Sequence, residues 1–140
     1  MKRIVGFDFG LKRIGVAVGN PKFQTAQALT TLAAKEGVPV WNQVHEIIGQ
    51  WKPAYLVVGL PLSMDGDETD ISRNARKFGA QLTEQTNLEV LFVDERLTSV
   101  IADQLLEESA AQGKRKQARN KAARDQLAAE LILRTHFDEN

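Results

Sequence analysis

The chain has 140 residues, of which 43% are hydrophobic, and this length and composition predict a single globular domain over residues 1–140. It contains no cysteine, which excludes a disulfide framework and thiolate metal sites, and no apolar run approaches the roughly 20 residues of a membrane span. The 18 basic and 18 acidic residues cancel, but they are segregated: residues 114–124 hold six cations, and residues 65–70 hold four acids. Because Asp8 interrupts the apolar start of the chain, we expect no signal peptide, no membrane attachment and a cytoplasmic location.

The first half of the chain predicts strands followed by a helix. Residues 2–9 and 13–19 favour two strands, and the short link between them contains glycine, which favours a hairpin. Residues 27–32 predict a third strand. Residues 40–51 place apolar side chains at helical spacing, and the continuous apolar run at 55–60 suits a strand buried on both faces.

The second half alternates helices with one more strand. Residues 71–86 predict a helix with Asp70 as its N-cap, and residues 88–93 predict another apolar strand. A helix over about residues 98–111 and a final helix over 122–136 complete the order β-β-β-α-β-α-β-α-α. This order predicts an α/β fold with a mixed sheet and helices on both faces, in which a site forms at the carboxyl ends of the strands.

Three acids stand among apolar neighbours. Asp8 ends the first strand, Glu95 follows the last strand, and Asp125 lies in the final helix. An α-helix turns by about 100° per residue, so the residues on the same helix face as Asp125 are small or apolar, namely Ala122, Ala128, Ala129 and Ile132. Such a face can pack closely on the sheet and carry Asp125 to the strand ends. If the three acids converge, their repulsion requires a cation, and oxygen ligands select Mg²⁺ or Mn²⁺. Two ions about 4 Å apart would activate water for phosphodiester hydrolysis.

Each feature also has a plain structural explanation. Asp8 can form a turn or a cap, and Asp125 can pair with Arg124 or Lys121 on a solvated helix face. Neighbouring strand residues point to opposite faces, so at most one of Asp94 and Glu95 faces a site. The basic stretch and the acidic stretch are both compatible with solvated loops. The chain has only two histidines, and neither suggests a Ser-His-Asp set.

Four segments read GFDFGLKRIGVAV, VVGLPLSMDGDETD, VDERLTS and AARDQLAAELIL. Together and in this order, they resemble the motifs of the YqgF family of pre-16S rRNA nucleases, which are similar to Holliday-junction resolvases. The resemblance covers residues 2–133. It implies a ribonuclease-H-like fold with a five-stranded mixed sheet, whose first three strands are antiparallel, and helices on both faces.

The resemblance also implies the chemistry of the site. The catalytic, metal-binding carboxylates would be Asp8, Glu95 and Asp125, holding two Mg²⁺ or Mn²⁺ ions. Asp8 would bridge both ions, Glu95 would hold one, and Asp125 would complete the other. Related resolvases often carry a further acid one helical turn beyond the last, but here that residue is Ala128.

The expected activity is endonucleolytic processing of the 5′ end of pre-16S ribosomal RNA in ribosome biogenesis. We expect structured RNA, and contact with ribosomal particles, on a monomer or weak homodimer. The nucleic-acid backbone would contact basic side chains, which position a strand without reading its sequence. These are Lys12, Arg13, Lys114, Arg115, Lys116, Arg119, Lys121 and Arg124.

Three other functions stay open at this point. A DNA-junction resolvase would use the same site, paired on a symmetric dimer. The pattern from Asp8 to Ala17 also resembles the first phosphate loop of actin-like and sugar-kinase ATPases, but those proteins enclose the nucleotide between two domains. A non-catalytic module that binds RNA or regulates transcription would keep the carboxylates for structural reasons. The glycines Gly10 and Gly15 can permit close approach at the site or serve turns and packing.

Overall fold

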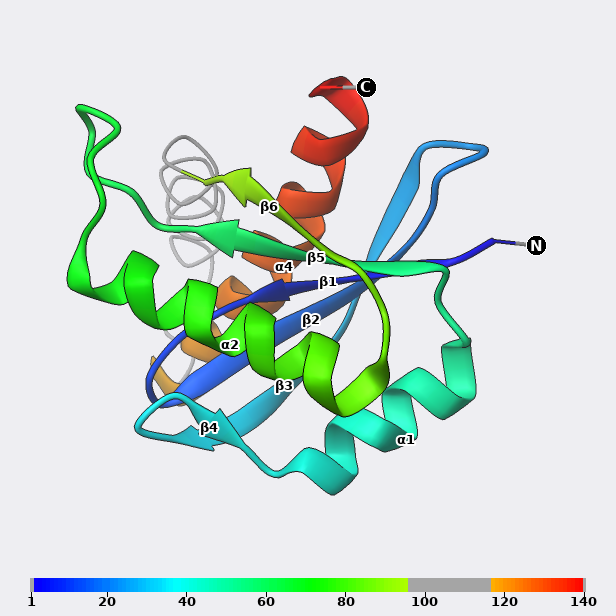
Figure 1. The fold of residues 1–140 in the computed structure, drawn as a ribbon, viewed down its shortest axis with the longest axis horizontal. Coiled ribbons are helices and arrows are strands. Elements are labelled where there is room, and N and C mark those ends of the chain that lie inside the picture. Colours follow the sequence, from blue (N-terminus) through cyan, green and yellow to red (C-terminus); the bar gives the residue numbers. More distant parts are fainter. Residues whose placement is uncertain (1, 96–116, 140) are drawn as a thin grey trace.

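A six-stranded mixed sheet forms the centre of the computed structural model, which describes residues 2–95 and 117–139 (Figure 1). The strands lie in the order β4-β3-β2-β1-β5-β6. Successive strands from β1 to β4 pair antiparallel, whereas β5 joins parallel to β1 and β6 joins parallel to β5. The predicted mixed sheet with an antiparallel start is confirmed. The strands are β1 (Ile4–Asp8), β2 (Arg13–Asn20), β3 (Thr25–Lys35), β4 (Val38–Pro39), β5 (Tyr55–Leu60) and β6 (Val90–Asp94).

The sheet has one strand more than the five predicted. The extra strand, β4, spans two residues and pairs with Ala34 and Lys35 at the end of β3. A strand of this length shows no alternation of apolar and polar side chains, so periodicity does not reveal it. β3 is also longer than the predicted stretch 27–32, because its pairing with β2 extends from Thr25 to Ala33 and its pairing with β4 continues to Lys35.

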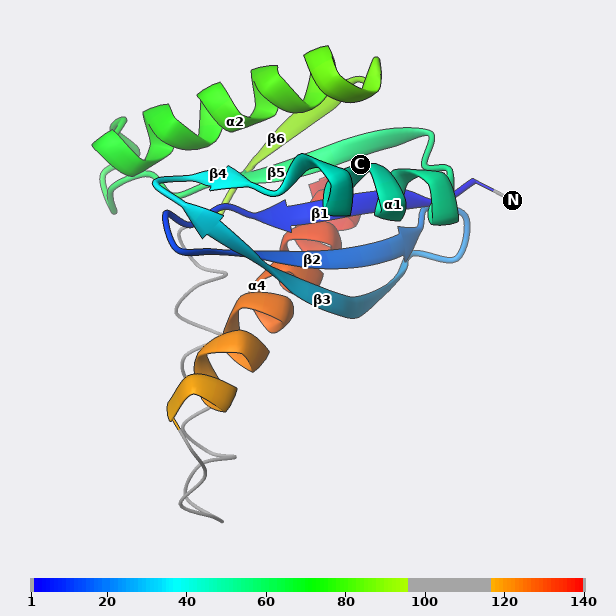
Figure 2. The same cartoon turned by 90° about the horizontal axis from the view of Figure 1, so that it is seen from below.

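Helices cover both faces of the sheet, as predicted (Figure 2). α4 (Gln117–Glu139) lies on one face, and α1 (Trp41–Trp51) and α2 (Asp70–Thr86) lie on the other. Strand alternation supplies both layers: Ile4 belongs to the buried cluster with α4, whereas Val5 belongs to the cluster with α1 and α2. Every second residue of β1 therefore faces α4.

The start of α2 differs from the prediction, because its N-cap is Thr69 and not Asp70. The hydroxyl oxygen of Thr69 accepts a hydrogen bond from the backbone N–H of Ser72 (3.1 Å). In return, Ser72 Oγ accepts from the backbone N–H of Thr69 (2.7 Å). This capping box satisfies two backbone donors that the helix cannot pair itself.

The final helix is longer than the predicted range 122–136. α4 begins at Gln117, so residues 117–124 of the basic stretch are helical. The helix predicted over residues 98–111 lies outside the described residues. No helix within the described ranges combines the length and the apolar character that crossing a membrane requires.

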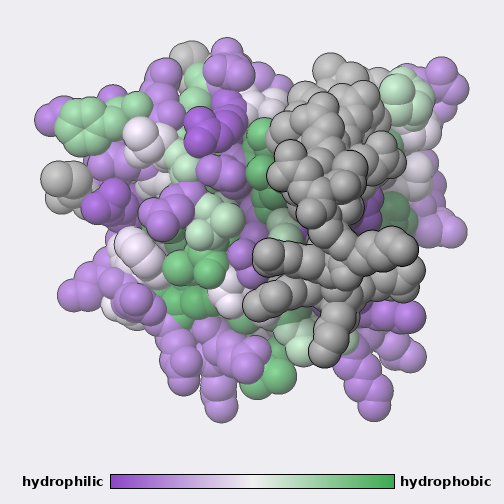
Figure 3. All heavy atoms as spheres, turned by 180° about the vertical axis from the view of Figure 1, so that it is seen from behind, coloured by the Kyte–Doolittle hydropathy of each residue, from purple (hydrophilic) through white to green (hydrophobic). Residues whose placement is uncertain are grey.

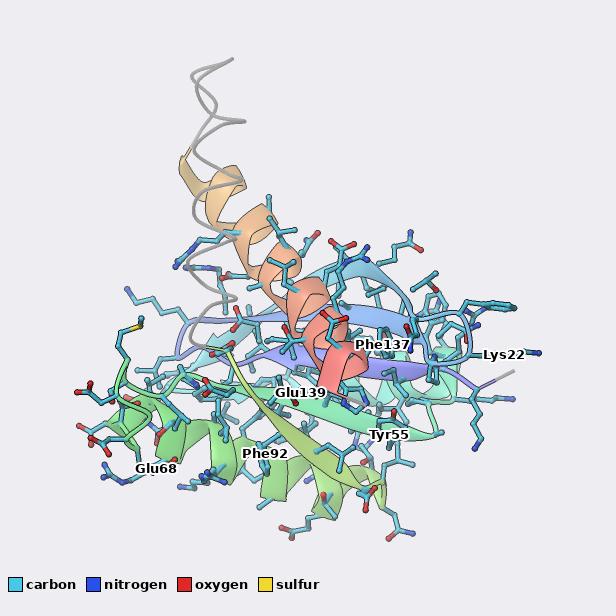
Figure 4. The ribbon with its side chains drawn as sticks, turned by 90° about the horizontal axis from the view of Figure 1, so that it is seen from above. Lys22, Tyr55, Glu68, Phe92, Phe137 and Glu139 are labelled. Atoms are coloured by element: carbon cyan, nitrogen blue, oxygen red, sulfur yellow. The ribbon has the colours of Figure 1, made fainter. Side chains whose placement is uncertain are left out.

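Aromatic residues pack α4 against the sheet at the end that carries the β2–β3 turn (Figure 4). The Tyr55 hydroxyl and His136 Nε2 lie 2.8 Å apart, and the rings of His136 and Phe137 are 5.8 Å apart at their centroids. Burial lowers the pKa of His136. The other histidine, His45, is hydrogen-bonded to Gln85 (3.1 Å). Both histidines therefore have partners away from the strand ends that carry Asp8 and Glu95.

Large apolar side chains that stay exposed lie on the short strand β4 and on turns and loops of the described residues. They are Leu11, Phe23, Val38, Val40 and Met64. In the space-filling view, the coloured surface is mainly hydrophilic, with apolar side chains in small patches (Figure 3). The coloured part of the face seen in this view therefore shows no single large apolar patch.

Candidate active site

An open pocket of about 430 Å³ lies where β1 and β6 end and α4 crosses them. β1, β5 and β6 point their carboxyl ends toward the same side of the molecule, and the loop between β5 and α2 lies on that side too (Figure 1). All three predicted carboxylates line the pocket. It is also lined by three of the predicted cations. These six residues are Asp8, Glu95, Asp125, Lys12, Arg13 and Arg124.

Strand alternation explains why these side chains meet. Gly6 lies two residues before Asp8 and faces α4, because a Cβ at Gly6 would come 2.7 Å from the Leu133 side chain. On β2, Gly15 faces α4 in the same way, and Arg13 shares its side of the strand. A Cβ at Gly15 would collide with the backbone oxygen of Asp125. The site therefore lies in the layer between the sheet and α4.

Glu95 reaches this layer by extending β6 beyond its last strand residue. Its backbone N–H donates to the carbonyl of Leu60 (3.2 Å), which continues the pairing of β5 with β6. Its Oε2 lies over Gly59, where a Cβ would come within 2.5 Å of it. Asp94, one residue earlier, is not among the pocket residues. The prediction that only one of the two acids faces the pocket agrees with this placement.

Asp8 and Glu95 form a hydrogen-bonded carboxyl pair. Burial raises the pKa of Asp8 to about 7, the hydrogen bond from Glu95 opposes that rise, and the charge of Asp125 adds to it. Burial also raises the pKa of Glu95 to about 9, and the adjacent charge of Asp8 adds to the rise. Two carboxylates in contact cannot both ionise readily without a cation, so the pair holds a proton at neutral pH.

One oxygen of this pair has no partner. Glu95 is 3% exposed, and its buried Oε2 makes no hydrogen bond with the described residues. An unpaired buried carboxylate oxygen is costly in a folded protein. A hard divalent cation at this position would take the place of the shared proton and satisfy the free oxygen. The donor set of Asp8 and Glu95 therefore fits Mg²⁺ or Mn²⁺.

Asp125 is held differently. Arg13 Nε donates to its Oδ2 at 2.9 Å, with the two side chains 38% and 15% exposed. From the sequence, Arg124 or Lys121 on a solvated helix face was the expected partner of Asp125, whereas the ion pair with Arg13 joins α4 to β2. Ala128, one turn further along, also lines the pocket. The position at which the family resemblance suggested a further acid thus contributes a methyl group to the pocket wall.

The three carboxylates do not form a ready metal centre in this arrangement. Within residues 2–95 and 117–139, no three acidic or histidine side chains are placed to hold an ion together. Asp8 and Glu95 contact each other, whereas the carboxylate of Asp125 is turned to Arg13. The convergence of all three on shared ions therefore stays a prediction.

The predicted nucleic-acid contacts fall into three groups. Lys12 and Arg124 are exposed and line the pocket with Arg13. Arg119 and Lys121 lie in the first turns of α4. Lys114, Arg115 and Lys116 lie outside the described residues. Sequence reasoning assigned no role to Pro61 and Ile71, which form part of the pocket wall. Pro61 directly follows the buried strand β5, and Ile71 lies in the first turn of α2.

Two solved structures define the class of fold. The chain aligns with RuvC of Thermus thermophilus, solved in complex with a Holliday junction substrate, with 15% identity, a TM-score of 0.54 and coverage of 99% of this chain and 95% of that one. It aligns with the fowlpox virus resolvase, in complex with Holliday junction DNA, with 11% identity, a TM-score of 0.55 and coverage of 98% and 97%. The protein therefore has the ribonuclease-H-like fold that the sequence predicted.

Sequence comparison places the chain within that class. The model of the RuvX family, described as Holliday junction resolvase, matches residues 2–139. A relative from Nitrosococcus oceani is 47% identical over 137 residues, covering 97% of this chain and 86% of the relative. A relative from Pseudomonas fluorescens is 44% identical over 140 residues, covering 100% and 94%. Both are named "Putative pre-16S rRNA nuclease". The chain belongs to this family, which confirms the resemblance to the YqgF motifs.

Proposed function

We propose that this protein is a metal-dependent endonuclease that hydrolyses phosphodiester bonds and processes the 5′ end of pre-16S ribosomal RNA. The observation that carries the proposal is the buried Asp8–Glu95 pair, in which Glu95 Oε2 has no hydrogen-bond partner among the described residues, in a pocket that cations also line. A cation-binding carboxylate pair beside phosphate-binding side chains is the arrangement that phosphodiester hydrolysis needs. The names of the relatives support RNA as the substrate.

The carboxylates Asp8, Glu95 and Asp125 would hold Mg²⁺ or Mn²⁺, and we propose two ions. The bound ions would supply an activated water and stabilise charge on the leaving oxygen. The protein itself sets the geometry. β1 and β5–β6 fix the two strand-end carboxylates, and the close packing of α4 on Gly15 fixes the backbone of Asp125.

Basic side chains at the pocket would position the nucleic acid. Lys12 and Arg124 are exposed at its edge and would contact the phosphate backbone without reading bases. We propose the same role for Arg119, Lys121 and the three cations at 114–116. We also propose that the protein acts in the cytoplasm, in contact with ribosomal precursor particles, as a monomer or weak homodimer.

A DNA-junction resolvase is the second candidate, because the matching family model is described by that activity. Contacts with the phosphate backbone can form with RNA and with DNA, so the pocket residues do not indicate which of the two is the substrate. Resolution of a junction also requires two sites on a symmetric dimer. Substrate preference and oligomeric state therefore discriminate between the candidates.

A side-by-side cleavage assay tests the proposal. A structured 16S precursor RNA, a single-stranded RNA and a four-way DNA junction are incubated with Mg²⁺ or Mn²⁺. The enzymes are wild type, Asp8→Asn and the control Asp65→Asn, which makes the same change at an exposed acid outside the pocket. We expect cleavage of the precursor RNA to fall at least about 100-fold in Asp8→Asn and to stay unchanged in the control. RNA binding without cleavage by wild type would instead favour a non-catalytic module.

A further inference from the structure

The ion pair between Arg13 and Asp125 occupies a carboxylate that the proposed function assigns to a metal ion. We propose that Arg13 is an internal counter-cation, which holds Asp125 in the metal-free protein and is displaced from it when a divalent ion binds. The inference rests on the proposed function, since it concerns the same pocket. It adds a role for Arg13 as a positioning residue that competes with the metal.

The contact itself shows which atoms compete. Arg13 Nε donates to Asp125 Oδ2 over 2.9 Å, and the Asp125 side chain is 15% exposed. A carboxylate this buried needs a compensating charge. Asp8 and Glu95 lie in the same pocket but add negative charge, so they cannot supply it. The guanidinium thus fills the electrostatic role that a bound cation would otherwise fill.

The backbone around Asp125 cannot move away to change this arrangement. Its carbonyl oxygen packs directly on Gly15, where no Cβ could fit, and Ala129 behind it is fully buried. Gly15 and Arg13 lie two residues apart on β2 and face the same way. The partner of the carboxylate can therefore change by side-chain rotation alone, with α4 held in place.

The ion pair is weak enough to be exchanged. The Arg13 side chain is 38% exposed, and ion pairs with solvent access contribute little free energy. Without this competitor, we expect the affinity for a divalent ion to rise about two- to fivefold. Once released, the guanidinium stays on the wall of the pocket, where its N–H groups can donate hydrogen bonds to a substrate phosphate.

Removing any positively charged side chain from the pocket would raise its affinity for a metal ion. The test therefore needs a matched control. Lys12 precedes Arg13 in sequence, lines the same pocket and is exposed. Lys12→Gln removes the same charge without breaking the ion pair. Arg13→Lys keeps the charge at the position and should restore the competition.

The measurement is a Mn²⁺ titration of the full chain without nucleic acid, in which electron paramagnetic resonance reports free Mn²⁺. Wild type, Arg13→Gln, Arg13→Lys, Lys12→Gln, Asp125→Asn and the double variant Arg13→Gln/Asp125→Asn are compared at low salt, where charge effects are least screened. Circular dichroism confirms that each variant is folded. We expect Arg13→Gln to bind Mn²⁺ about two- to fivefold more tightly than Lys12→Gln, and this gain to disappear when Asp125 is also replaced.

The outcomes separate this inference from the proposed function. If wild type binds Mn²⁺ but Arg13→Gln binds no more tightly than Lys12→Gln, the competition is overturned while the metal site stands. If the gain persists without Asp125, the competition is likewise overturned. If no variant binds Mn²⁺, both the competition and the metal-dependent function fail.

Discussion

The buried pair of Asp8 and Glu95 makes the metal-free protein sensitive to pH. Both pKa values are raised, to about 7 and about 9, so the folded protein binds protons that the unfolded chain has already lost. The stability from this pair is fully present near pH 4. It is lost progressively as the pH rises through 7 and toward 9.

We therefore predict that, in EDTA, the free energy of unfolding falls by several kcal/mol between pH 5 and pH 8. Asp8→Asn should show a smaller fall, because the amide has no charge to bury and no longer raises the pKa of Glu95. Urea denaturation at the two pH values measures both proteins. Equal pH dependence in wild type and Asp8→Asn would contradict the assignment of the effect to this pair.

At the level of single residues, the sequence predicted the candidates but not their partners. Asp8, Glu95 and Asp125 stood out because each interrupts an apolar stretch next to a strand end or on a helix face. The pairing of Asp125 with Arg13 joins residues 112 positions apart, so no local pattern contains it. Local spacing suggested Arg124 or Lys121, and tertiary packing selected an arginine on a strand instead.

Among the elements, the contact between α4 and β2 controls the geometry of the site. We predict that Gly15→Ala costs about 2–4 kcal/mol of unfolding free energy, because its Cβ would collide with the backbone oxygen of Asp125. Gly49→Ala is the matched control, since that glycine lies in α1 with open space around its Cβ position. It should stabilise the protein by about 0.5–1 kcal/mol. Denaturant unfolding of both variants checks the contrast, and similar effects at both positions would refute it.

The N-cap of α2 provides a second prediction at this scale. Thr69→Ala should lower the unfolding free energy by about 1 kcal/mol, because the backbone N–H of Ser72 loses its acceptor. Thr83→Ala removes the same atoms from an exposed position inside α2 and should be neutral or slightly stabilising. Thermal unfolding of the two variants compares them. A loss at Thr83 as large as at Thr69 would show that the cap is not the cause.

The element boundaries that sequence reasoning missed share a physical cause. Thr69 and Asp70 are both good N-cap residues, and only the reciprocal bond with Ser72 distinguishes them. The first turns of α4 are rich in polar residues and carry no apolar stripe, so periodicity placed its start too late. By contrast, the apolar run of β5 was predicted with its observed bounds, because burial on both faces leaves a continuous signal.

At the scale of the whole molecule, ligand binding should be visible as a gain in stability. We predict that millimolar Mg²⁺ raises the melting temperature of wild type at pH 8, since a ligand that binds only the folded state stabilises it. The rise should be largely absent in Asp8→Asn and retained in Asp65→Asn, whose acid lies outside the pocket. Differential scanning fluorimetry measures all three, and an equal rise in Asp8→Asn would place the ion elsewhere.

The path of the chain through the site has a consequence for how the protein is made. Asp8 ends β1, the first element described, and Asp125 lies in α4, the last. α4 packs against β1, β2 and β3, so its arrival closes a sheet face that earlier strands leave open. The residues of α4 must therefore leave the ribosome before the carboxylates can meet. The pocket that we propose for cutting ribosomal RNA thus stays incomplete while the six strands are being made.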